Sequence, residues 1–278
     1  MKTVQLAQGV QSSILGFGCA PILGAVGAGQ AERALGTALD HGITHFDVAR
    51  SYGYGEAEKF LGRFLHGRRD EVVIASKFGI RATWKASLLR PLKPLVRTIR
   101  PRRGGPPGQS TTPAPQSPAR KDPFHERVPL TAAEMRGNLE HSLRALKTDH
   151  LDLFFVHEPT AGIPHIDELS ETAARLKDEG KIRAWGLAFG WRQLPALESI
   201  IDAFDVLQFD ASPGAGHYEN ARSARAGSPN VIFSPMRHRG GLDPTATLRK
   251  LWEDFPRSVV LCSMFDPSHI RANAGAAG

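Results

Sequence analysis

Short apolar runs alternate along this chain with longer stretches whose apolar residues recur every three or four positions. The runs are bounded by glycine or polar residues and predict strands, and the periodic stretches predict amphipathic helices. The predicted strands span residues 14–20, 44–49, 71–79, 151–158, 182–189, 206–210, 230–235 and 258–264. The predicted helices span residues 31–42, 56–67, 131–148, 166–180, 194–204, 245–255 and 266–278, with a short polar helix or turn over 218–227.

Eight strands that alternate with eight helical stretches favour a closed (β/α)8 TIM barrel, and we expect one such domain over residues 1–278. The continuous apolar run over 151–158 is typical of a parallel strand that is covered on both faces. An open doubly wound sheet is the rival fold. It would place G-x-G-x-x-G after its first strand, and the glycine-rich stretch over 15–29 lacks that pattern.

One segment, residues 80–130, breaks the alternation after the third predicted strand. It holds ten of the 20 prolines and 11 of the 35 lysines and arginines, but only two of the 28 acidic residues. The net charge of +7 therefore belongs to this segment and not to the whole chain. Connections between a strand and the next helix are usually about 2 to 6 residues long, so the segment is a large insertion. Its Gly/Pro/Ser/Gln-rich tract predicts partial disorder.

The insertion leaves the predicted barrel at the carboxyl ends of the strands, where active sites of such barrels lie. Three interpretations stay open: a solvated tether, a lid over the barrel mouth, or a basic strip that docks an anionic partner or a membrane surface. Its only aromatic residues are Trp84 and Phe124. Because two aromatics are too few for a base-stacking platform, we expect no nucleic-acid partner.

Composition narrows the class of protein further. No apolar run approaches the roughly 18 residues of a membrane span, so we expect no integral membrane segment. The amino-terminal stretch lacks the apolar core of a signal peptide. Cys19 and Cys262 are the only cysteines, which argues against a disulfide framework. We therefore expect a cytoplasmic protein.

Ionisable residues follow three consecutive predicted strands at their carboxyl ends. Asp47 ends the second strand, with Tyr52 in the loop after it, Lys77 ends the third and His157 ends the fourth. Each alone has an ordinary structural interpretation, but together they predict an active site. A buried Lys77 held by Asp47 would lower the pKa of Tyr52 from about 10. Tyr52 would then exchange a proton with a substrate oxygen that His157 orients, which suits carbonyl reduction.

The same residues carry a resemblance to the aldo/keto reductase superfamily. "FDVARSYGYGEAEKFLG" resembles its signature, in which an Asp is followed five residues later by a Tyr. "VVIASKFG" and "LDLFFVHEP" resemble its strands with the catalytic Lys and His, and "GKIRAWGLAFG" resembles its fifth strand. The resemblance covers nearly all of the chain apart from residues 80–130.

The resemblance implies an NAD(P)H-dependent oxidoreductase that acts on a small carbonyl or alcohol substrate by hydride transfer, with Tyr52 as general acid/base. Asp47, Lys77 and His157 complete its catalytic residues. The implied cofactor-binding residues are Gln208 at the carboxamide, Phe233 at the nicotinamide face, Ser234 and Met236 at the pyrophosphate, and Ser263, Met264, His269 and Asn273 at the adenosine end. No metal is implied.

Two departures from the family pattern bear on the cofactor. Ala188 and Phe189 replace the usual Ser-Asn pair that contacts the carboxamide. Ser263 and His269 stand where NADP-preferring members usually place Lys and Arg. The family favours NADP, and these positions keep NAD open. They also leave an alternative function open, a cofactor-binding sensor or regulatory protein with little or no turnover.

Overall fold

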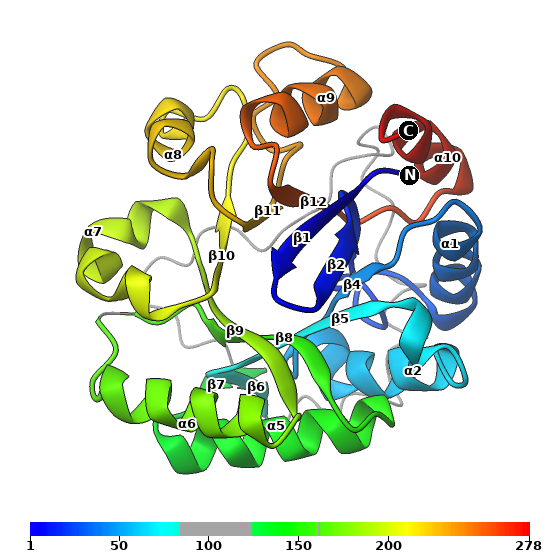
Figure 1. The fold of residues 1–278 in the computed structure, drawn as a ribbon. Coiled ribbons are helices and arrows are strands. Elements are labelled where there is room, and N and C mark those ends of the chain that lie inside the picture. The colour runs from blue at the N-terminus through cyan, green and yellow to red at the C-terminus, as the bar shows by residue number, and fades with distance from the viewer. Residues whose placement is uncertain (84–123, 161) are drawn as a thin grey trace.

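Eight parallel strands close into a barrel in the computed structural model, which describes residues 1–83, 124–160 and 162–278 (Figure 1). In chain order they are β3 (Leu15–Gly18), β4 (His45–Asp47), β5 (Val73–Phe78), β8 (Leu151–His157), β9 (Ile182–Phe189), β10 (Val206–Asp210), β11 (Asn230–Phe233) and β12 (Ser258–Cys262). Each pairs with the next, and β12 returns to β3. The predicted (β/α)8 barrel is confirmed.

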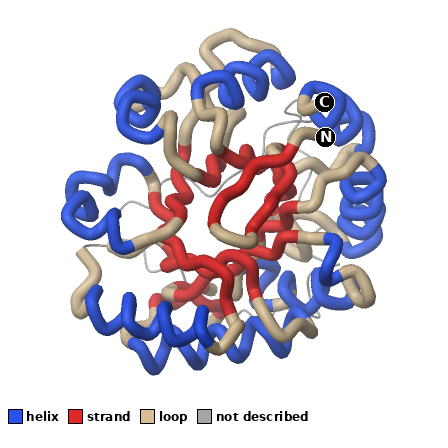
Figure 2. The backbone as a smooth tube through the Cα atoms, in the orientation of Figure 1, coloured by secondary structure: helices blue, strands red, loops and turns tan. Residues whose placement is uncertain are grey.

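Helices surround the barrel as an outer ring (Figure 2). They are α1 (Ala28–Asp40), α2 (Ala57–Phe64), α5 (Ala132–Leu146), α6 (Ile166–Asp178), α7 (Leu194–Leu197), α8 (Tyr218–Arg225), α9 (Pro244–Asp254) and α10 (Pro267–Ala276). The helix predicted over 194–204 is α-helical only in its first turn and continues as a 3-10 helix over Glu198–Ala203. Two adjacent β-branched residues, Ile200 and Ile201, lower the α-helical propensity there. No helix in the described part of the chain has both the length and the apolarity to cross a membrane.

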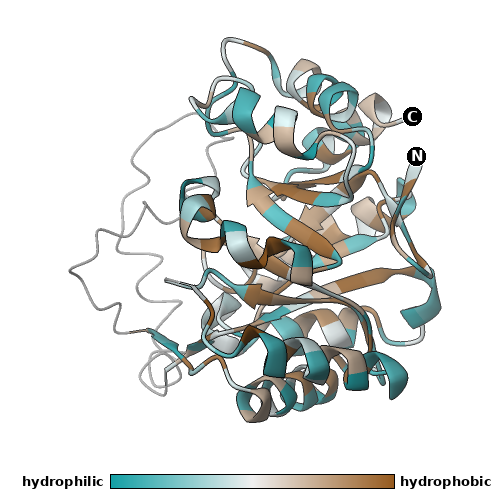
Figure 3. Ribbon diagram, turned by 60° about the vertical axis from the view of Figure 1, so that its left-hand side comes forward, coloured by the Kyte–Doolittle hydropathy of each residue, from teal (hydrophilic) through white to brown (hydrophobic). Residues whose placement is uncertain are grey.

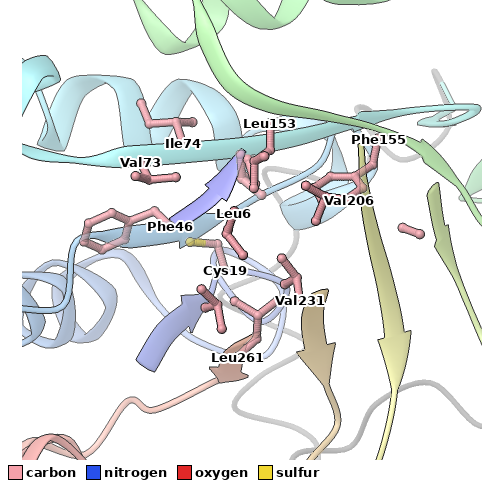
Figure 4. Packing of buried hydrophobic residues seen from close by; sticks show 14 of the residues in the cluster. Leu6, Cys19, Phe46, Val73, Ile74, Leu153, Phe155, Val206, Val231 and Leu261 are labelled. Carbon is pink, nitrogen blue, oxygen red and sulfur yellow. The ribbon is translucent and has the colours of Figure 1, made fainter. Parts of the chain in front are cut away.

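The core lies inside the barrel and between the barrel and its helices. Figure 3 shows the strands as mainly hydrophobic and the outer helices as mixed. An amino-terminal hairpin that the sequence did not predict, β1 (Thr3–Ala7) with β2 (Val10–Ser13), adds Leu6 to this core. In Figure 4 Leu6 lies among side chains that come from several barrel strands. Arg183, near the start of β9, donates to the carbonyl of Gly9 in the hairpin turn, so the hairpin covers the amino ends of the strands.

The amino end of the barrel also contains a fully buried carboxylate, Asp152, whose partners are all structural. Its Oδ2 accepts from the Ile74 N–H at 2.8 Å and pairs with Arg69 Nη2 at 2.8 Å. Its Oδ1 lies 3.0 Å from Arg183 Nη1. A buried charge is tolerated when it is paired and hydrogen-bonded, and these partners give Asp152 a structural role. The predicted catalytic residues lie at the opposite end of the barrel, where the strands have their carboxyl ends.

The two ends of the predicted insertion form a short antiparallel ribbon at that opposite end. β6 (Ile80–Ala82) pairs with β7 (His125–Arg127), with Ile80 opposite Arg127. The sequence analysis expected no strand here, because two three-residue strands joined by a long connection produce no local periodicity. Residues 84–123, to which the predicted disorder, lid and docking strip refer, lie outside the described residues.

Candidate active site

The four predicted catalytic residues meet at the carboxyl ends of three adjacent strands. Lys77 Nζ on β5 donates to Asp47 Oδ1 on β4 at 2.5 Å, and also to the Val48 carbonyl at 3.1 Å. Nζ lies 5.1 Å from the centroid of the Tyr52 ring. The Tyr52 and His157 rings are 6.1 Å apart, edge to face. The predicted grouping of these residues is thus present in the structure.

The ion pair between Asp47 and Lys77 is buried, with the two residues 3% and 2% exposed. A buried charge is tolerated when it is paired and hydrogen-bonded. Lys77 has two oxygen partners, and the second Asp47 oxygen accepts from Gln208 Nε2 at 2.8 Å. Asp47 therefore connects Lys77 with β10 on the far side of the barrel mouth.

Tyr52 reaches the site through a tight turn over Tyr52–Gly55, four residues after the end of β4. Gly53 has a φ of 58° in this turn, and a Cβ there would lie 2.6 Å from the Ile22 carbonyl oxygen. A side chain cannot fit at that distance, so glycine lets the turn pack against the β3–α1 loop. The turn leaves the Tyr52 side chain partly buried between Lys77 and His157.

The predicted lowering of the Tyr52 pKa is wrong for this structure. Burial, and then the negative charges of Asp47 and Glu158, raise the pKa of Tyr52 well above its usual value of 10. The physical reason is that Asp47 lies against Lys77 and offsets the ammonium charge, while burial disfavours a phenolate. Tyr52 is therefore a protonated phenol over the physiological range, which is the form that can donate a proton.

His157 is held in its neutral form. Burial, and then the positive charges of Lys77 and Arg127, lower the pKa of His157 well below its usual value of 6.5. Its Nδ1 atom is buried and has no hydrogen-bond partner among the described residues. A neutral imidazole can donate or accept a hydrogen bond, depending on its tautomer. This chemistry suits the orientation of a neutral oxygen group beside Tyr52.

The predicted nicotinamide end of the cofactor site lies at the carboxyl ends of β10 and β11. Gln208 is buried, and its Oε1 has no partner among the residues that the structure describes. Phe233 ends β11 and is partly exposed. Ser234 follows with a φ of 55°, and Met236 packs partly against the core. An unpaired buried amide oxygen is suited to accept an N–H from a bound ligand.

The four residues predicted for the adenosine end lie in the loop after β12 and on α10. Ser263 is exposed, and its Oγ donates to the Gly18 carbonyl at 3.0 Å. Asn273 Nδ2 is 3.2 Å from the sulfur of the buried Met264. His269 is exposed on α10. The structure thus pairs Asn273 with Met264, while their cofactor roles stay predictions.

The ribbon supplies two neighbours of the site that the sequence analysis missed. His125 Nε2 is 3.2 Å from the carbonyl oxygen of Ser51, next to Tyr52. Arg127 donates to the carbonyl of Glu158, next to His157. His125 lies 74 positions from Ser51 in sequence, and Arg127 lies 31 positions from Glu158. Local patterns carry no signal for such contacts.

A third missed residue, Asp210, ends β10. Its Oδ1 accepts from the Trp191 N–H at 2.6 Å. Asp47 was predicted as a site residue because it is an acid at the carboxyl end of a barrel strand. Asp210 has the same position on β10, so the same criterion would have found it.

Comparisons with known proteins agree with this geometry. The model of the aldo/keto reductase family matches residues 15–214. Aldo-keto reductase YhdN of Bacillus subtilis is 29% identical over 199 residues, which are 69% of this chain and 48% of the relative. D-threo-aldose 1-dehydrogenase of a Pseudomonas species is 30% identical over 190 residues, which are 65% of this chain and 51% of the relative. The chain thus spans about half the length of these curated relatives.

Solved structures show the same fold. A putative aldo-keto reductase from Pseudomonas aeruginosa is 24% identical, with a TM-score of 0.68 over 99% of this chain and 93% of that chain. An aldo/keto reductase from Klebsiella pneumoniae, crystallised with NADP and acetate, is 22% identical with a TM-score of 0.65 over 99% and 89%. At these identities the likeness supports the architecture of the barrel.

Proposed function

This chain belongs to the aldo/keto reductase family, and on that premise we propose that it reduces an aldehyde or ketone, or oxidises the matching alcohol, with Tyr52 as general acid/base. The observation that carries the proposal is the buried Asp47–Lys77 pair, with the Tyr52 ring centroid 5.1 Å from Lys77 Nζ and His157 beside Tyr52. No groups of three or more histidine, cysteine or acidic residues that could hold a metal ion occur within residues 1–83, 124–160 and 162–278.

Each side chain has one task in the proposed reaction. Tyr52 donates its phenolic proton to the carbonyl oxygen during reduction and takes it back during oxidation. Lys77 stabilises the negative charge that Tyr52 develops, and Asp47 holds Lys77 charged and in place. His157, as a neutral imidazole, hydrogen-bonds the substrate oxygen and fixes its orientation.

The proposed cofactor is NADPH or NADH, which supplies a hydride to the carbonyl carbon when bound. The unpaired Oε1 of Gln208 fits a carboxamide N–H, and Phe233 offers an aromatic face on the neighbouring strand. Two crystal structures of aldo/keto reductase from Klebsiella pneumoniae, which have the same fold, contain NADP and NADPH. Because Ser263 and His269 provide no permanent cation at the predicted 2′-phosphate position, we propose a weaker preference for NADP(H) over NAD(H) than in members with Lys and Arg there.

Titration of the purified protein with NADPH and NADH, followed by a screen of aldehydes and ketones, tests the proposal. We expect binding of at least one cofactor, a modest ratio of the two dissociation constants, and turnover of some carbonyl compounds. Tight binding without turnover on a broad panel would favour the alternative, a cofactor sensor. The buried apolar pair Ala188 and Phe189, in place of two polar residues, is the feature that favours this alternative.

The rate of carbonyl reduction is expected to stay nearly constant from about pH 6 to pH 9, since a general acid works while it keeps its proton. Because the pKa of Tyr52 is raised, its proton is lost only as the pH rises through a value above this range. Because the pKa of His157 is lowered, its neutral form is lost only as the pH falls below the range. The measurement is kcat/KM for one aldehyde at saturating cofactor across these pH values. A decline centred between pH 7 and 9 would contradict the raised pKa of Tyr52.

A further inference from the structure

Asp210 lies in the same part of the barrel mouth as the proposed nicotinamide site. It follows Gln208 by two residues on β10, so both side chains project from the same face of the strand. In the sheet register Asp210 is opposite Phe233 of β11. On its other side, Asp210 Oδ1 bonds the Trp191 N–H just beyond the end of β9. Asp210 thus lies between the two strands that hold Phe233 and the apolar pair Ala188–Phe189.

Within residues 1–83, 124–160 and 162–278, the charge of Asp210 is not offset by a permanent cation. Across the described part of the chain, no lysine or arginine lies within ion-pair distance of its carboxylate. His217 Nε2 lies 3.6 Å from Asp210 Oδ2, and it is a cation only when protonated. The residue is about one-fifth exposed, so water screens its charge only in part.

Asp205, the residue immediately before β10, is an aspartate whose charge is paired with a lysine. Its Oδ2 accepts from the Trp185 N–H of β9 at 2.9 Å, just as Asp210 accepts from Trp191. The same Asp205 oxygen also pairs with Lys177 Nζ at 2.5 Å. The two aspartates therefore have equal backbone roles between β9 and β10. They differ in that Asp205 has a fixed counter-ion, whereas Asp210 has none among the residues that the structure describes.

We propose that Asp210 supplies to the cofactor site a negative charge that no described lysine or arginine offsets, and thereby favours the oxidised nicotinamide over the reduced one. This inference rests on the proposed function, because it needs a nicotinamide beside Gln208. An oxidised nicotinamide ring carries a positive charge and the reduced ring carries none. Asp210 therefore attracts only the oxidised form, and the neighbouring Ala188 and Phe189 contribute no opposing charge.

The size of the effect follows from Coulomb's law. Unit charges about 8 Å apart at an effective dielectric constant of about 30 to 40 change an equilibrium roughly five- to tenfold. Stabilising the oxidised form within the site also favours hydride donation, so Asp210 biases the bound cofactor toward carbonyl reduction.

The test is the ratio of dissociation constants for reduced and oxidised cofactor, measured by fluorescence or calorimetry with NADPH and NADP⁺, and with NADH and NAD⁺. The pH is set to 8, where an imidazole is ordinarily neutral. Asp210→Asn removes the charge and keeps an oxygen that can accept from the Trp191 N–H. Asp205→Asn makes the same change at the far end of β10. Asp210→Glu keeps the charge.

The ratio of the reduced-form to the oxidised-form dissociation constant is expected to fall about five- to tenfold in Asp210→Asn. It should change less than about twofold in Asp205→Asn and Asp210→Glu. Asp210→Ser serves for the same comparison if melting curves show that the Asn variant is misfolded. An unchanged ratio in the folded, uncharged variants would overturn the role of Asp210 while leaving the proposed function standing. Failure of the wild-type protein to bind any of the four nucleotides would instead overturn the proposed function, and this inference with it.

Discussion

Replacing Tyr52 by phenylalanine is expected to lower the turnover number for carbonyl reduction by a factor of about 10² or more, the scale of a lost general acid. The phenylalanine ring keeps its contacts with Lys77 and His157 but has no proton to donate. Cofactor affinity should persist, because the Tyr52 hydroxyl is not among the predicted cofactor-binding groups. The measurements are steady-state kinetics with one good carbonyl substrate and a cofactor titration of the same preparation.

The matched control is Tyr54→Phe, which removes a second phenol from the same turn. The Tyr54 ring packs edge to face on Phe124, with centroids 5.9 Å apart, and so belongs to the contact between the turn and the ribbon. We expect turnover of this variant to stay within a few-fold of wild type. Near-normal turnover in Tyr52→Phe, or an equal loss in both variants, would contradict the role assigned to Tyr52.

The barrel could be predicted because its strands and helices have strong periodic patterns. All seven residues of β8, Leu151–His157, are buried, as expected for a mainly apolar strand that is covered on both faces. The positions of Asp47, Lys77 and His157 at strand ends followed from these boundaries. Because carboxyl ends of consecutive parallel strands meet at one face of a barrel, their proximity was predictable as well.

Other features depend on contacts that no local pattern encodes. The hairpin of β1 and β2 and the ribbon of β6 and β7 are made of strands of three to five residues, too short for a clear alternation. The direction of the Tyr52 pKa shift depends on how closely Asp47 approaches Lys77 and on how deeply Tyr52 is buried. Residue types alone predicted the opposite shift.

Substitutions in the Asp47–Lys77 pair are expected to have large effects, and those on unfolding free energy can be separated from those on turnover. Lys77→Met leaves the Asp47 carboxylate buried, with the Gln208 amide as its remaining hydrogen-bond partner among the described residues. Breaking a buried pair in this way costs about 3 to 5 kcal/mol in the free energy of unfolding, because an uncompensated charge remains. We expect Lys77→Met to unfold at a clearly lower denaturant concentration and to lose most of its turnover.

The double variant Asp47→Asn/Lys77→Met removes both charges. It therefore separates the contribution of Lys77 to stability from its contribution to turnover. Replacement of a whole buried ion pair by neutral groups is often close to neutral for stability. The double variant should therefore recover most of the lost unfolding free energy, while turnover stays low because Tyr52 lacks a neighbouring ammonium. Chemical denaturation of the wild type and the single and double variants gives the coupling energy, and kinetics on the same proteins gives the turnover. Recovery of activity together with stability would show that Lys77 holds the fold of the site and takes no part in the reaction. Full stability of Lys77→Met would show that the Asp47 charge finds other compensation, so that the pair is not what maintains the site.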